Sequence, residues 1–85
     1  MKSFNYLIQT SEGIHARPAS LIVSTSKEFS SNITITNKDK TVDAKRMIAV
    51  MSLNAKKGDN LEIVINGEDE TKAYEKLFNL FKENI

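Results

Sequence analysis

Gly-Ile-His-Ala-Arg-Pro-Ala, residues 13–19, marks the point where a strand-like pattern of side chains changes to a helix-like one. Before this stretch, Phe4, Tyr6 and Ile8 alternate with other residues at a period of two, which is typical of a strand. After it, apolar residues recur at helical spacing from Pro18 to about residue 29, which predicts a helix. The stretch therefore joins the first strand to the first helix.

The middle of the chain predicts a hairpin followed by a short helix. Residues 33–36 and 41–42 contain mostly β-branched side chains, and the polar residues between them favour a turn in which Asp39 takes the left-handed conformation. Apolar residues on more than one face predict a short helix over residues 47–53, with Asn54 as its C-terminal cap.

The last part of the chain predicts one more strand and one more helix. Leu61, Ile63 and Ile65 alternate with other residues, and three carboxylates at 68–70 stand where a helix N-terminus favours negative charge. The resulting order is βαββαβα. This order predicts an α+β fold, a two-layer open-faced β-sandwich with three helices on one face of the sheet.

Length and composition indicate one small globular domain over residues 1–85. Hydrophobic residues make up 40% of the chain and charged residues 27%, and a chain of this size buries a little over ~60% of its unfolded surface in a single core. No pattern in the sequence suggests a dimer seam, so we expect a monomer.

The charge and the absence of cysteine exclude several classes of function. A net charge of +1 is too small for nonspecific nucleic-acid binding, and the two middle strands lack aromatic residues that could stack on RNA bases. Without cysteine the chain forms neither disulfides nor zinc–thiolate sites, which fits a reducing compartment. Its apolar stretches are short and its first residues lack a signal-peptide core, so we expect a cytoplasmic protein without membrane insertion.

The one histidine, His15, lies at the predicted start of the first helix. The positive end of the helix dipole disfavours the protonated imidazole, so a ring nitrogen keeps the lone pair that can attack phosphorus. The free backbone N–H groups of the first turn, those of Ala16 and Arg17, could then bind the oxygens of a phosphoryl group. This placement predicts that His15 carries a phosphoryl group.

The neighbours of His15 suit that role. Arg17 is always charged, and its planar guanidinium can clamp two phosphate oxygens at once. Pro18 is tolerated in a first helical turn and disfavours helical geometry in the residue before it, so we expect Arg17 to be the cap residue. Gly13 permits a sharp turn and the close approach of a partner's active site. The alternative is an ordinary surface histidine, but five residue types at fixed spacing form a specific pattern.

Other chemistries have no comparable signal. One histidine and no cysteine leave only scattered carboxylates, so we expect no metal site. The chain has no Gly-x-Ser-x-Gly elbow of a serine hydrolase, and its three glycines are too scattered for a phosphate-binding loop. We therefore expect no nucleotide cofactor.

On residues 13–19 and on a second segment, residues 45–53, the chain resembles the histidine-containing phosphocarrier family, HPr, of the sugar phosphotransferase system. The resemblance extends over essentially the whole chain. It implies a four-stranded antiparallel sheet in the order 1-4-2-3 and a phosphoryl group carried on Nδ1 of His15 beside Arg17. It also implies transfer from phospho-enzyme I to enzyme IIA domains for sugar uptake, with no cofactor and no independent catalysis.

In the family, the short helix formed by the second segment contacts partner proteins. Met47, Ile48 and Met51 cannot all face the core from a short helix, and exposed methionines form adaptable docking surfaces. Together with Arg46 they form the predicted docking patch. Burial in the core is the alternative, and it stays open for Ile48, Val50 and Leu53.

Two residues depart from the pattern of the family. Some members carry a regulatory serine where this chain has Arg46, and arginine accepts no phosphate, so we expect escape from that control. Glu12 stands where a small polar residue is usual, and a carboxylate there would repel a phosphoryl group and favour the protonated imidazole. A specialised HPr-like regulatory binding module, which controls a partner protein rather than transport, is therefore the second hypothesis.

Overall fold

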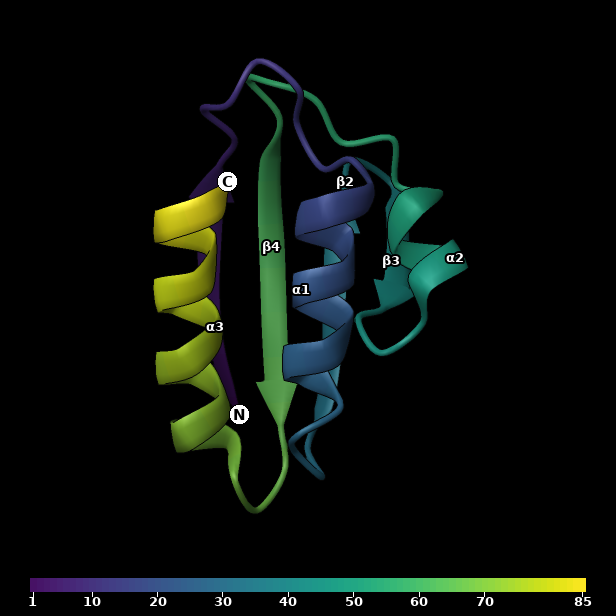
Figure 1. Ribbon diagram of the computed structural model, residues 1–85. Helices are drawn as coiled ribbons and strands as arrows, with labels where there is room; N and C mark the ends of the chain where they lie inside the picture. Colours follow the sequence, from purple (N-terminus) through teal and green to yellow (C-terminus); the bar gives the residue numbers. More distant parts are fainter.

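Figure 1 shows the computed structural model, which describes all residues from Met1 to Ile85. The elements in chain order are β1 (Lys2–Leu7), α1 (Ala16–Ser26), β2 (Asn32–Asn37), β3 (Lys40–Asp43), α2 (Met47–Met51), β4 (Asn60–Asn66) and α3 (Glu70–Asn84). The four strands form one antiparallel sheet in the order β1-β4-β2-β3, and the three helices lie on one face of it. The predicted fold class, element order and strand order are confirmed.

The core lies between the sheet and the helices. Along β2 and β4 alternate residues face the helices and are buried, whereas neighbours such as Thr34 and Glu62 point to the other face. From the helices, Ile22 of α1 and Leu77 and Phe81 of α3 have no exposed surface. The buried residues that recur every second position in the strands and at helical spacing in α1 and α3 thus form one apolar layer.

An aromatic cluster holds the edge strand β1 against α3. The ring of Phe4 meets the rings of Tyr74, Phe78 and Phe81 edge to face, with centroids 5.3 to 5.7 Å apart. Such pairs stabilise a fold beyond the apolar area that they bury. The connection that leaves β1 toward α1 therefore starts from a fixed position.

The hairpin turn between β2 and β3 corrects one prediction. Lys38, and not Asp39, takes the positive φ, at 58°. Asn37 pairs with Lys40, so the turn has two central residues, and two-residue hairpin turns require a positive φ at the first of them. After α2, Asn54 has the expected left-handed conformation with φ 51°, but the helix ends earlier and its C-cap is Ser52.

Asp69 connects the loop between β4 and α3 to the loop between α1 and β2, and both loops lie at the lower end of Figure 1. Its carboxylate accepts hydrogen bonds from the backbone N–H groups of Ser30 (2.9 Å) and Ser31 (3.0 Å) and from the Ser31 hydroxyl. The bond from the Ser31 hydroxyl, followed by that from the Ser30 N–H, lowers the pKa of Asp69 from 3.8 to about 2. The charged carboxylate therefore joins the start of α3 to the loop before β2.

The substitution Asp69→Asn is expected to lower the melting temperature by several degrees at neutral pH, because an amide N–H group would then face N–H donors. The folded pKa of about 2 lies below the ordinary 3.8, so the charge stabilises the fold above pH 3.8 and this contribution is lost as the pH falls toward 2. Melting curves of the variant and the parent protein should converge near that lower limit. Asp39→Asn, in the exposed hairpin turn, is the control. Equal melting temperatures of Asp69→Asn and the parent protein at pH 7 would contradict the prediction.

Candidate functional site

Two connections lie side by side at the upper end of Figure 1, residues 8–15 before α1 and residues 52–59 before β4. Backbone hydrogen bonds join them: the Ile8 N–H donates to the Asp59 carbonyl (2.9 Å), the Gly58 N–H to the Ile8 carbonyl (2.9 Å) and the Ile14 N–H to the Ala55 carbonyl (3.1 Å). The side chain of Ile14 is buried in the core. The backbone immediately before His15 is therefore held by a hydrogen bond to the connection before β4 and by the buried side chain of Ile14.

Gly13 makes the closest contact between these two connections. Its φ is 65°, and a Cβ atom at this position would lie 2.2 Å from the Ala55 carbonyl oxygen and 2.9 Å from Lys56 Cα. Only glycine fits such a conformation and such a close approach without displacing the backbone. The sequence predicted the sharp turn but not Ala55 and Lys56, because the contact is made by their main chain and leaves no signal in residue type.

His15 is the N-cap residue of α1. Its backbone is extended (φ −102°, ψ −169°), and its carbonyl accepts the first helical hydrogen bond from the Ala19 N–H at 3.0 Å. The side chain makes no capping hydrogen bond and is 46% exposed. The ring is thus partly exposed at the positive end of the helix.

The helix start corrects the prediction that Arg17 is the cap. α1 begins at Ala16, so Arg17 is its second residue and Pro18 its third. Pro18 and Ala19 are buried, and their packing together with the bond to the His15 carbonyl outweighs the bias of proline against a helical residue before it. Because proline has no N–H, the Ala16 and Arg17 N–H groups are the two helical donors without a partner beside His15. Both residues are exposed, and the binding of phosphate by their N–H groups stays a prediction.

Glu12 is brought close to the imidazole. Its Oε1 atom lies 3.9 Å from Nε2 of His15, and its side chain is 76% exposed. Nε2 is the nitrogen across the ring from Nδ1, the atom to which the resemblance assigns the phosphoryl group. The nitrogen for which the contact with the carboxylate is recorded is therefore not the one expected to bond to phosphorus, and the effect of Glu12 on transfer stays a prediction.

Comparison with known proteins agrees with this geometry. Residues 2–83 match the protein family described as the PTS HPr component phosphorylation site. The chain belongs to the HPr family. It is 36% identical over 83 residues to the phosphocarrier protein HPr of Lysinibacillus sphaericus, a match that covers 98% of this chain and 94% of that protein. HPr proteins are phosphocarriers of the phosphotransferase system.

Solved HPr structures share the fold. One, HPr from Thermoanaerobacter tengcongensis, has a TM-score of 0.90 and 36% identity, covering 96% of this chain and 92% of that chain. Another, described as a catabolite repression containing protein, is Crh of Bacillus subtilis in a swapped dimer, with a TM-score of 0.77 and 32% identity. That match covers 94% of this chain and 92% of Crh.

The helix α2, which was predicted to carry the docking patch, lies beside α1 in Figure 1. Arg46 is its N-cap, and Ile48 is 83% and Met51 40% exposed, whereas Met47 is partly buried. Val50 and Leu53 belong to the core. The sequence left open whether Ile48, Val50 and Leu53 are core residues. Val50 and Leu53 are, and Ile48 is exposed.

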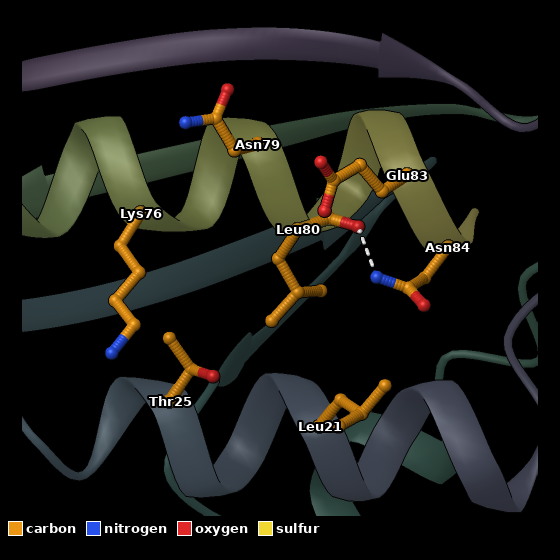
Figure 2. A pocket seen from close by; sticks show the side chains of 7 residues that line it. All are labelled: Leu21, Thr25, Lys76, Asn79, Leu80, Glu83 and Asn84. Carbon is orange, nitrogen blue, oxygen red and sulfur yellow. Dashed lines mark hydrogen bonds between the residues drawn. The ribbon is translucent and has the colours of Figure 1, made fainter.

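A groove elsewhere on the molecule contains none of the predicted site residues. It runs between α1 and α3, and Figure 2 shows the seven side chains that line it: Leu21, Thr25, Lys76, Asn79, Leu80, Glu83 and Asn84. The imidazole of His15, which is partly exposed, does not line this groove. The structure contains no cluster of three or more histidine or carboxylate side chains placed to hold a metal ion. None of its helices combines the length and the apolar character needed to cross a membrane.

Proposed function

We propose that this protein accepts a phosphoryl group on Nδ1 of His15 from phospho-enzyme I and passes it to enzyme IIA domains for sugar uptake. One observation carries the proposal: the only imidazole of the chain is exposed at the N-cap of α1, next to two unpartnered helical N–H groups. Membership of the HPr family supports it. Gly13 and Pro18 shape the site by fixing the turn and the start of the helix.

The transfer step requires a lone pair and an environment for negative charge. The Nδ1 lone pair forms a bond to phosphorus while the bond between phosphorus and the donor breaks, and the electron pair of that bond leaves with the donor. The N–H groups of Ala16 and Arg17 and the guanidinium of Arg17 then bind the phosphoryl oxygens. Passing the group on reverses the step, since the electron pair of the N–P bond returns to Nδ1.

The open position of His15 accounts for a carrier rather than an independent catalyst. A group on an exposed ring is stabilised by few residues of its own protein, and a partner must supply the remaining groups that lower the barrier. Such a carrier needs no cofactor. We also propose that it acts as a monomer in the cytoplasm, which sedimentation and cell fractionation would test.

Incubation with enzyme I and phosphoenolpyruvate tests the proposal. We expect one acid-labile phosphoryl group per chain, seen by intact mass, and a phosphorus–nitrogen bond at Nδ1, seen by phosphorus NMR. The same enzyme I must label a known HPr in parallel. If it labels the known HPr and leaves this protein unlabelled, the proposed function is wrong.

The docking patch is proposed as the partner surface. Ile48→Ala should weaken binding to enzyme I about tenfold, because an exposed apolar anchor contributes about 1–2 kcal/mol at an interface. Its melting temperature should stay unchanged, since Ile48 is 83% exposed. Calorimetric titration gives the affinity. Leu7→Ala, 53% exposed on β1, is the matched control, and an equal loss of affinity in both variants would contradict the prediction.

The presence of Arg46 supports the proposal that this protein is not regulated by phosphorylation of a serine at this position. The position at the N-cap of α2, where the regulatory serine of some HPr proteins is expected, holds a side chain that no serine kinase can phosphorylate. The fixed positive charge is opposite in sign to that of phosphoserine. Transfer by this protein should therefore be independent of such a kinase.

A regulatory role is the second candidate, favoured by the similarity to Crh. The exposed His15 beside Arg17 argues against a purely binding role, because neither side chain is needed for the fold. Complementation of a strain that lacks its phosphocarrier distinguishes the two functions. Restored sugar uptake supports the carrier, and its absence in a strain whose enzyme I labels the protein supports the regulatory module.

A further inference from the structure

The carboxylate of Glu12 faces one particular nitrogen of the His15 ring. Oε1 of Glu12 is 3.9 Å from Nε2, and no other carboxylate forms an ion pair with this ring. Glu12 and His15 are held on one surface because the two residues between them are fixed, Gly13 by its contact with Ala55 and Ile14 by its buried side chain. Glu12 itself makes no hydrogen bond that would hold its carboxylate elsewhere.

A neutral imidazole carries its proton on one of two nitrogens, and the other nitrogen keeps the lone pair. A negative charge near Nε2 favours the tautomer with the proton on Nε2, because the N–H bond directs its positive end toward the carboxylate. In that tautomer Nδ1 is the free nucleophile. We propose that Glu12 is a positioning residue that selects the tautomer of His15 competent for phosphorylation at Nδ1, an inference that rests on the proposed function.

The same contact stabilises the ring after the phosphoryl group has been attached. When Nδ1 forms the bond to phosphorus, the proton stays on Nε2 and the ring becomes positively charged. Oε1 of Glu12 is 3.9 Å from Nε2 of this ring. In the proposed phosphorylated state, the phosphoryl oxygens would be bound on the Nδ1 side by the N–H groups of Ala16 and Arg17. The attraction between the carboxylate and the charged ring would then offset part of the repulsion expected from the sequence.

Other charges near the site do not duplicate this contact. Arg17 belongs to α1 and Lys56 to the connection that contacts Gly13, and both are positive and exposed. Neither can attract the Nε2 proton. Because Glu12 and the ring are both well exposed, the effect is that of a screened surface pair and should be about twofold in the tautomer ratio.

Nitrogen NMR of the unphosphorylated protein tests the role directly. With labelled histidine at about pH 8.5, well above the ordinary titration range of the ring, the two nitrogen shifts report the tautomer ratio. We expect the share protonated on Nε2 to fall about twofold relative to the Nδ1 form in Glu12→Gln and further in Glu12→Lys. Glu68→Gln, exposed in the turn at the other end of the sheet, should leave the ratio unchanged. High salt should reduce the differences between the variants.

Phosphorylation by enzyme I, measured on the same variants, separates this inference from the proposed function. At the same pH of about 8.5, and at high enough phospho-enzyme I and salt that long-range repulsion is screened, the initial rate should follow the tautomer ratio and fall in Glu12→Gln by up to about twofold. Identical nitrogen shifts in the parent protein, Glu12→Gln and Glu12→Lys overturn the role of Glu12, even if all three proteins are phosphorylated. Absence of labelling in the parent protein overturns the proposed function whatever the nitrogen shifts are.

Discussion

The variant His15→Ala is expected to accept no phosphoryl group at all while it keeps the stability of the parent protein. The chain has a single histidine and no cysteine, so no second side chain of either type can replace the acceptor. The fold should persist, because the ring makes no capping hydrogen bond and is 46% exposed. Substitutions at such surface positions change the free energy of unfolding by about 0.5 kcal/mol or less.

Intact mass after incubation with enzyme I and phosphoenolpyruvate measures the loss, and a melting curve measures the fold. Ser20→Ala is the matched control, because Ser20 is an exposed hydroxyl one turn further along α1. It should be labelled as fully as the parent protein. Labelling of His15→Ala, or failure to label Ser20→Ala, would place the acceptor on another residue.

The elements could be predicted because side-chain periodicity follows burial. In β4, Leu61, Ile63 and Ile65 face the helices and their neighbours do not, so the pattern of two is a direct consequence of the fold. The candidate site could also be located from the sequence, because the one histidine stands close to an arginine and a proline where a strand pattern changes to a helix pattern. The strand order came from the resemblance, because periodicity does not specify which strands are neighbours.

Contacts made by the main chain, or across long stretches of sequence, could not be predicted. The carboxylate of Asp69 was expected at the start of a helix, but it turns to Ser30 and Ser31, which are 39 and 38 positions away in the chain. The approach of Glu12 to the His15 ring depends on the backbone between them, which Gly13 and Ile14 fix through their contacts with Ala55. Sequence patterns record burial and charge, whereas such geometry arises only after the connections have packed.

Gly13→Ala is expected to disturb both fold and transfer. A Cβ atom would lie 2.2 Å from the Ala55 carbonyl oxygen, and the positive φ of 65° is unfavourable for alanine. Strain of this kind costs about 1–3 kcal/mol, and the backbone clash adds to it, so the melting temperature should fall by roughly 10 °C or more. The connections before α1 and before β4 must separate, which weakens the bond from the Ile14 N–H and shifts His15.

The variant Gly58→Ala distinguishes the effect of the steric clash with Ala55 from the effect of placing alanine at a positive φ. Gly58 also has a positive φ, 92°, but a Cβ atom there meets nothing within 4 Å. This variant should therefore lose stability only through its backbone conformation and should be phosphorylated at the parental rate. Gly13→Ala should lose more stability and show a rate at least several-fold lower, because its backbone clash acts two residues from His15. Equal melting temperatures and equal rates in the two variants would mean that the contact with Ala55 does not position the imidazole.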